Sequence, residues 1–258
     1  MSTPLTAAGY VWDLLLVLVR KELKLRYRGT SLGILWSLGN PIALAVVLHV
    51  AFRRVLDVDI DRYAAFILSA LFPWQWFSNS ITEGSKSFLE NGDLIKKLPF
   101  PRIAIPAAVV AGDLVHFVIT LPVLALVLVW ESGTPPPVGW ASGVPLLVAL
   151  QASLTLGAVV IVASAHTLFR DIGQLTRVAL LLLFYVTPIL FPASMLPPDL
   201  RWLLVANPLA PIISCWRHLV MKGSPGPLLP AAVVWTLLVS VTAAAVYRSI
   251  RPRLAELV

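Results

Sequence analysis

Charge, and negative charge above all, is what this sequence has least of. Only 13 of its 258 residues are acidic, and charged residues make up 13% of the chain, whereas apolar residues make up 58%. A soluble domain normally has about 25% charged residues, so this composition argues against a soluble globular enzyme. The single cysteine, Cys215, excludes an intrachain disulfide and says little about the redox compartment.

Sequence motifs of nucleotide binding and of common hydrolases are also missing. The chain has no G-x-x-x-x-G-K-[ST] loop, which excludes nucleotide binding by that route. It has no H-E-x-x-H, no G-x-S-x-G and no cluster of Cys and His at metal-ligand spacing. Asp57, Asp59 and Asp61 alternate and could bind a cation, but nearby arginines favour a solvated loop. We therefore expect no catalytic residue and no metal, and a membrane enzyme is only a remote alternative.

Long apolar stretches are what the sequence has in abundance. A helix needs about 20 mostly apolar residues to cross the hydrocarbon core of a bilayer. Six stretches meet this requirement, at 34–52, 63–82, 103–130, 143–168, 175–191 and 228–247. They predict an all-α integral membrane protein with six transmembrane helices. Residues 1–33 would precede this domain, 34–247 would form it, and 248–258 would be a cytoplasmic tail.

The 20 Lys and Arg residues are distributed unevenly between these stretches. Fourteen lie before the first stretch, in the segments that follow the second and fourth stretches, or in the tail. The other six lie in the segments that follow the first, third and fifth stretches. Under the positive-inside rule, this asymmetry places both termini in the cytoplasm. A nucleic-acid-binding protein would instead gather its basic residues on one solvated face with stacking aromatics, so we expect no nucleic-acid partner.

Residues 10–28 are predicted to form an amphipathic helix on the inner membrane surface. Its apolar residues recur at helical spacing, and its basic residues point away from them; the two sets are Trp12, Leu16, Val19, Leu23 and Tyr27, and Lys21, Lys24 and Arg28. Such a helix turns its basic side toward anionic headgroups. The alternative is an ordinary juxtamembrane basic segment that only fixes the orientation of the chain.

Two loop regions have unusual apolar content. The loop near 83–102 contains the segment 88–97, which could form a short helix with exposed apolar residues suited to docking a soluble partner. The segment 192–227 contains two apolar stretches too short to span a bilayer, which we interpret as re-entrant or interfacial helices. Re-entrant backbone is tolerated only where protein or a water-filled cavity covers it, which favours a transport pathway over an anchor.

Aromatic and ionisable residues inside the stretches are a further signal. Aromatics usually form interfacial belts, but their faces also stack on sugar rings. Candidates for lining a glycan conduit are Phe72, Trp74, Trp76, Phe77, Phe184 and Tyr185.

Asp113 is the one acid well inside a stretch, with His116 one turn on. For Asp113 we favour two roles equally. One is functional, and the other is structural, either as a buried pair or through a hydrogen bond to a neighbouring helix.

Four segments, in this order, share one resemblance. They are Leu25–Arg28 with Leu32, Gly33, Trp36, Asn40 and Pro41; Leu94–Lys97 with Phe100–Arg102 and Pro106; Arg170–Ile172; and Thr187–Ile189 with Pro192, Leu196, Pro197, Asn207, Pro208 and Arg217. Together they resemble the ABC-2-type permeases that export polysaccharides, which are the membrane subunits of O-antigen, teichoic acid and capsule exporters. The pattern near 207–217 is shared with ABC-2 drug exporters, so the segment from Arg26 to Trp36 is what favours polysaccharide.

The resemblance implies a multi-pass homodimer in the bacterial inner membrane, with two copies of a separate ATP-binding subunit. ATP and Mg would be bound by that partner, and this chain would bind no cofactor. The implied substrate is a lipid-linked glycan on a polyprenyl diphosphate. Alternatives are export of a small hydrophobic drug or antibiotic, and, more remotely, a channel or a membrane enzyme.

The resemblance also implies roles for individual residues. A gate for the substrate headgroup would use Arg26, Tyr27, Arg28 and Trp36. Coupling to the ATPase would use Phe88, Leu89, Leu94, Ile95, Lys96 and Lys97. An outer gate would use Pro197, Asn207, Pro208 and Arg217.

Overall fold

The computed structural model describes residues 7–27 and 61–258, together with residues 39, 42–43, 46–47 and 50 between them. Regular structure in this part of the chain is entirely helical. The helices are α1 (Ala7–Tyr27), α3 (Tyr63–Gly84), α4 (Ser87–Glu90), α5 (Gly92–Lys97), α6 (Ala104–Ser132), α7 (Trp140–Leu168), α8 (Ile172–Val186), η3 (Ala193–Met195), η4 (Pro198–Leu200), α9 (Leu203–Ala206), α10 (Ala210–Lys222), α11 (Leu229–Ile250) and α12 (Leu254–Leu257). The predicted all-α class is confirmed. The predicted stretch 34–52 lies outside the described residues, apart from the isolated positions above.

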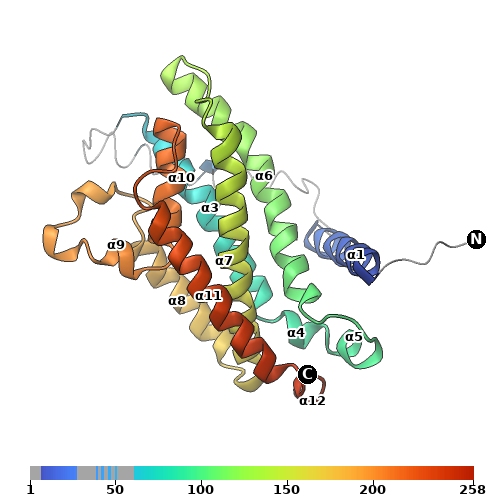
Figure 1. Ribbon diagram of the computed structural model, residues 1–258. Coiled ribbons are helices and arrows are strands. Elements are labelled where there is room, and N and C mark those ends of the chain that lie inside the picture. Colours follow the sequence, from blue (N-terminus) through green and yellow to red (C-terminus); the bar gives the residue numbers. More distant parts are fainter. Residues whose placement is uncertain (1–6, 28–38, 40–41, 44–45, 48–49, 51–60) are drawn as a thin grey trace, which may run out of the picture.

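Helix α3 occupies the centre of a bundle (Figure 1). It packs against α6, α7 and α10, while α11 packs along α7 and α1 packs across α6. We call the end that carries α4, α5 and α12 the basal end. The opposite end, with the turns 133–139 and 223–228 and the start of α3, is the distal end.

Helix α3 is enclosed because it is apolar on almost every side. From Tyr63 to Phe77 nearly all of its side chains are buried, whereas α11 buries only a few of its residues. A helix that is hydrophobic all round belongs in the interior. The main core cluster therefore forms around α3, with side chains from α6, α7 and α10 packed against it.

The described helices include fewer clear spans than the six predicted. Three helices, α6, α7 and α11, are long and apolar enough to cross a membrane, and the bent pair Pro198–Ala206 and Ala210–Lys222, with 97° between its halves, could count as a fourth. Helix α8 has 15 residues, which gives a length of about 22 Å at 1.5 Å per residue. Because the hydrocarbon core is about 30 Å thick, α8 alone is short for a crossing. Six spans remain a prediction.

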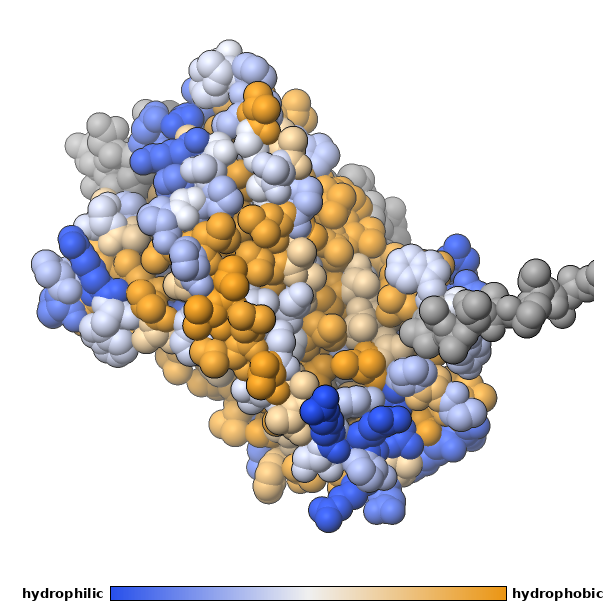
Figure 2. Space-filling model, viewed as in Figure 1, coloured by the Kyte–Doolittle hydropathy of each residue, from blue (hydrophilic) through white to orange (hydrophobic). Residues whose placement is uncertain are grey.

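The surface matches a membrane environment. Figure 2 shows a broad apolar band across the middle of the molecule, with hydrophilic residues gathered toward its two ends. The band includes side chains of α11 that are more than half exposed, among them Val234, Leu237 and Val241. Exposed apolar surface on this scale marks a protein or membrane contact, and together with the long apolar helices it identifies an integral membrane protein.

Helix α1 confirms the helix predicted at 10–28, but it packs through a different face. Leu18 is buried against Ala104 and Ala108 of α6. Trp12 and Leu16, which the spacing placed on the apolar side, are exposed at 60% and 38%. Apolar residues surround most of this helix, so periodicity alone could not identify which face meets the protein.

The distal end is held by contacts that involve backbone. The carboxylate of Glu131, near the end of α6, accepts hydrogen bonds from the N–H groups of Ala64 (3.1 Å) and Ala65 (2.9 Å) in the first turn of α3. Those donors have no partner within their own helix, and negative charge is favourable at a helix N-terminus. Beside them, Gly139 at the start of α7 lies directly against the backbone of Gly223, which has φ +78°.

We predict that Gly139→Ala destabilises the protein by about 1–3 kcal/mol or prevents its assembly, because small-to-large changes in tight packing cost this much. The added Cβ would overlap the carbonyl oxygen of Gly223, and backbone cannot move aside as a flexible side chain can. The measurement is thermal unfolding of the detergent-solubilised chain.

The matched control is Gly112→Ala. A Cβ there would meet only the Cβ of Glu22, at an ordinary 3.9 Å. Equal melting temperatures for the two variants would contradict the close approach of the two backbones.

Candidate functional site

Helices α4 and α5 form a small platform at the basal end. Phe88 and Ile95 are buried, at 0% and 3% exposure, and they share a core cluster with Ile105, Ala163 and Leu254. The expectation that the segment 88–97 exposes its apolar residues is therefore wrong for these two. Helices α12 and α7, which are distant in sequence, come together with the platform and enclose them. Leu89 and Leu94 are half-buried, while Lys96 and Lys97 are exposed.

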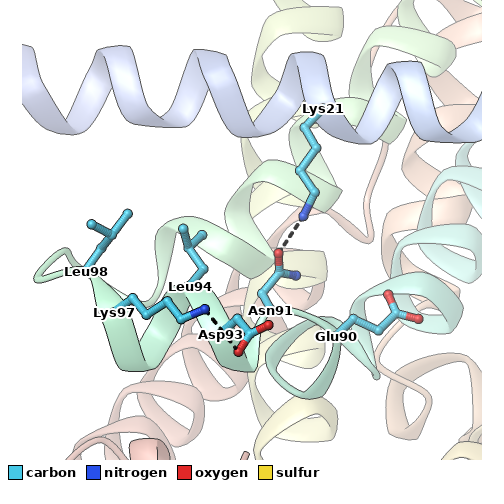
Figure 3. A pocket seen from close by; sticks show the side chains of 7 residues that line it. All are labelled: Lys21, Glu90, Asn91, Asp93, Leu94, Lys97 and Leu98. Carbon is cyan, nitrogen blue, oxygen red and sulfur yellow. Dashed lines mark hydrogen bonds and ion pairs between the residues drawn. The ribbon is translucent and has the colours of Figure 1, made fainter.

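One hydrogen bond joins α1 to this platform (Figure 3). Lys21 Nζ donates to Asn91 Oδ1 at 2.6 Å, and Asn91 Nδ2 donates to the carbonyl oxygen of Ser87 at 2.8 Å. Asn91 is buried at the junction between α4 and α5. The sequence predicts that Lys21 faces the lipid headgroups. In the structure its ammonium group instead faces the junction between α4 and α5.

The Lys21–Asn91 contact stands in an open cleft of about 450 Å³ between α1 and the platform. Leu94 and Leu98 point toward α1 (Figure 3), and Leu94 packs beside the cluster around Leu18. One charged and one apolar contact therefore connect the two elements.

Most charges on the platform are paired locally. Lys86 contacts Glu83 at 2.9 Å and Glu90 at 3.3 Å, and its hydrogen bond to Glu83 is the main reason that its pKa is raised above the ordinary value. Lys97 lies 3.7 Å from Asp93. The ion pairs of the described residues do not include Lys96, so its charge is presented at the surface.

The predicted gate residues are largely beyond what the structure describes. Arg26 and Tyr27 are the last two residues of α1, but the described part of the chain does not include their side chains. Arg28 and Trp36 lie outside the described residues altogether. The headgroup role assigned to these four positions stays a prediction.

Four of the six predicted conduit aromatics are buried within the bundle: Phe72, Trp74, Trp76 and Phe77. The Trp76 ring stacks on Phe117 of α6 with 5.0 Å between centroids, and Phe117 meets Trp216 of α10 edge-on at 5.1 Å. In this arrangement these rings contact other side chains of the same chain. The other two lie on α8. The ring centroids of Phe184 and Trp74 are 5.5 Å apart, and Tyr185 is 62% exposed.

Gln151 is a central residue that the sequence reasoning missed. It is fully buried on α7, donates from Nε2 to the carbonyl oxygen of Pro73 at 2.7 Å, and accepts from Trp216 Nε1 at 2.6 Å. It thereby joins α3, α7 and α10. A signal existed, because Gln151 is an amide in the middle of the apolar stretch 143–168, and an isolated polar side chain there needs a partner.

Asp113 and His116 are buried together between α6 and α3. Ser80 Oγ donates to Asp113 Oδ2 at 2.9 Å, and His116 Nδ1 lies 3.9 Å from Asp113 Oδ1. Both structural alternatives foreseen for Asp113, the pair and the bond to a neighbouring helix, are present together. Glu22 of α1 lines a small pocket with His116, so this cluster also reaches the surface helix.

Arg217 is the most heavily bonded side chain at the distal end. Its guanidinium donates to the carbonyl oxygens of Pro188 (2.6 Å), Ile189 (2.7 Å), Phe191 (3.4 Å) and Phe66 (3.4 Å). It also lies 3.7 Å from the centroid of the Phe66 ring, a cation–π contact. The planar guanidinium thus fixes the irregular backbone that follows α8.

Asn207 holds the same backbone from a second direction. Its Nδ2 donates to Thr187 Oγ1 at 2.9 Å, and its Oδ1 accepts from the N–H of Leu209 at 2.9 Å. Two of the four predicted outer-gate residues, Asn207 and Arg217, therefore converge on residues 187–191. Pro208 lies next to Asn207 and is half-buried, while Pro197 is exposed on a separate part of the segment.

The described residues contain no group of three or more His, Cys, Asp or Glu that could hold a metal ion. Asp57 and Asp59 lie outside the described residues, and Asp61 pairs with Arg62 at 3.0 Å.

Comparison with known proteins gives one consistent result. A family model described as ABC-2 type transporter matches residues 13–221, which span α1 to α10. An O-antigen export system permease protein of Klebsiella pneumoniae is 36% identical over 250 residues, covering 96% of each chain. A protein of the same description from Myxococcus xanthus is 33% identical and covers 94% of each chain. A polysialic acid transport protein of Escherichia coli is 26% identical, over 89% of this chain and 90% of its own.

We predict that Arg217→Lys destabilises the protein by about 1–3 kcal/mol, because a single ammonium group cannot reach carbonyls on both sides of the guanidinium, and buried acceptors left unpaired cost this much. The measurement is the melting temperature in detergent. Lys222→Arg, on the exposed end of the same helix, is the control and should change it little. A fully stable Arg217→Lys chain would contradict the anchoring role.

Proposed function

Because the chain belongs to the ABC-2 type transporter family, we propose that it is the membrane-spanning permease subunit of an ATP-driven exporter of polysaccharide. The observation that carries this proposal is its similarity, across almost its whole length, to O-antigen export system permeases at 33–36% identity. The match to polysialic acid transport proteins supports the same class of cargo. Export of a small hydrophobic drug is the alternative within the family.

The cargo would be a glycan linked to a polyprenyl diphosphate, carried from the cytoplasm across the inner membrane. Two copies of this chain would form the pathway, in six spans each, with both termini in the cytoplasm. The excess of basic residues on the basal side supports this orientation. The bent pair formed by η4–α9 and α10 would then be re-entrant from the outer side.

Energy would come from a separate ATP-binding subunit that holds ATP and Mg. The chain has no P-loop of its own, and the family is one of ABC transporters. The platform of α4 and α5 is the proposed docking surface, because its exposed face carries Lys96 and Lys97 while Phe88 and Ile95 anchor it to α6, α7 and α12.

Movement of the platform would reach α1 through the Lys21–Asn91 hydrogen bond and the Leu94 contact. Helix α1 ends at Arg26 and Tyr27, followed by Arg28, where the substrate diphosphate is proposed to bind. A shift of α1 would therefore admit the lipid headgroup while the glycan passes between the two copies.

The aromatic rings of α8 are the proposed contacts for sugar, since Tyr185 is exposed and Phe184 is half-buried.

The function is tested by depleting the protein in its own bacterium. We expect lipid-linked polysaccharide to accumulate inside the cell and to disappear from the surface, and the intact gene should restore export. Altered drug sensitivity with normal surface polysaccharide would instead favour the drug-exporter alternative.

The link between α1 and the platform generates a second prediction. Asn91→Leu should reduce export several-fold in the depleted strain, because Lys21 loses its acceptor. Lys21→Met should reduce export to a similar degree, and the double variant should be no worse than either, since the residues act as one unit. Surface polysaccharide per cell, at matched protein level, is the measurement.

Lys24→Met is the matched control, because Lys24 lies one turn from Lys21, is exposed, and has no ion pair or hydrogen bond to another described residue. Normal export in Asn91→Leu, or an equal defect in Lys24→Met, would contradict transmission through this contact.

A further inference from the structure

We infer that the distal end contains a binding pocket for a phosphate group carried on a hydrocarbon chain. This inference rests on the proposed function for the identity of the substrate, but the pocket itself is argued from its own residues. It is a cavity of about 300 Å³ between α10, the start of α3, the segment after α8 and the turn 223–228. It lies at the opposite end of the bundle from the platform of α4 and α5.

One face of α10 supplies the polar side of this pocket. Ser214, Arg217, His218, Met221 and Lys222 all line it, and their spacing of three, four, seven and eight places them along one side of a helix. Three of the five carry positive charge or can gain it. Among the described residues no acidic side chain lines the cavity, and their ion pairs include neither Arg217, His218 nor Lys222.

His218 leaves one ring nitrogen available in this pocket. The ring of His218 is held through Nδ1, which lies 2.7 Å from the carbonyl oxygen of Ser224, so Nε2 is left for a ligand. Gly226, with φ +79°, allows the turn to approach the imidazole, because a Cβ there would lie 2.6 Å from His218 Cγ. The hydroxyl of Ser214 is buried and has no hydrogen-bond partner among the described residues.

The C-terminal end of α10 opposes this attraction only in part. Free carbonyl groups at a helix C-terminus carry partial negative charge, but the Leu219 carbonyl oxygen is paired, since it accepts from the N–H of Gly223 at 2.8 Å and from Trp140 Nε1 at 3.2 Å. The formal charges that line the pocket are those of the basic side chains.

The remaining walls are apolar and suit a hydrocarbon chain. They include Phe66, Pro192, Pro227 and Leu228. A free inorganic anion would leave these walls in contact with water, whereas a lipid phosphate would use both halves of the pocket. Two lipids share that chemistry, the diphosphate-linked substrate after it has crossed the membrane and an ordinary anionic phospholipid. We assign the site to the substrate, because the proposed function delivers the diphosphate headgroup to this end of the molecule.

The test measures protection of a cysteine placed in the pocket. Met221→Cys is labelled with a water-soluble thiol reagent in the detergent-solubilised full-length chain; native Cys215 is fully buried and gives little background. We expect undecaprenyl diphosphate to slow labelling about tenfold more than undecaprenol does, as a single charge-assisted hydrogen bond would already produce. In the His218→Gln/Lys222→Gln background this difference should disappear.

Two controls locate the effect. Val138→Cys, on a residue 92% exposed at the same end, should be labelled at one rate with or without lipid, and slow labelling of buried Cys215 reports that the double variant is folded. Lys96→Gln/Lys97→Gln removes two basic residues from the basal end and should leave the protection of Met221→Cys unchanged.

The possible outcomes separate the existence of the pocket from its assignment to the substrate. Equal protection by undecaprenol and its diphosphate, no protection by either, or protection that survives the His218→Gln/Lys222→Gln change would each overturn the pocket. Protection by phosphatidylglycerol as strong as by the diphosphate would overturn its assignment to the substrate and identify a bilayer lipid instead. Labelling needs neither ATP nor export, so a failure here with normal results in the depletion experiment refutes only this inference, and the reverse refutes only the proposed function.

Discussion

Helix α3 is enclosed by α6, α7 and α10, so its polar groups must find their partners inside the protein. An unpaired polar group in an apolar interior is costly, and here α6 and α7 supply the partners: Glu131 of α6 for the first N–H groups, Gln151 of α7 for the carbonyl of Pro73, and Asp113 of α6 for Ser80. These bonds are spaced along the helix from its distal to its basal half. They fix the register of α6 and α7 against α3, and the rest of the bundle is built on that frame.

The two ends of the bundle are held by different kinds of contact. At the distal end, Arg217 and Asn207 bind backbone groups, and Gly139 lies against the backbone of Gly223. Such contacts leave little room for local adjustment, so the segment after α8 and helix α10 should move as one body. At the basal end, α1 meets the platform through a long lysine side chain and a leucine, which can break and re-form. A transporter needs both a rigid end and an adjustable end, because a force applied at one end must move a rigid element at the other.

Scattered short segments carry the resemblance to polysaccharide exporters, and the structure brings several of them together. Residues 187–191, Asn207 and Arg217 are up to 30 positions apart in sequence but form one hydrogen-bonded group. Leu94 and Ile95 belong to a platform that packs on α1 and α12. Asn91, which joins the platform to α1, was passed over, although an Asn-Gly pair between two short apolar runs marks a helix break. Trp216 gave no signal, because an aromatic in a short apolar stretch has several ordinary roles.

The sequence by itself determined that this is an all-helical integral membrane protein of the ABC-2 type transporter family, since apolar length and the order of short motifs are properties of the chain. It also singled out Asp113 and His116, while the structure shows that they are buried together. Only the tertiary structure decided that Phe88 and Ile95 are core residues, that α1 packs through Leu18, and that three basic residues of α10 share one pocket. The reason is that periodicity specifies which side of a helix is apolar, whereas the neighbour that covers that side comes from elsewhere in the chain.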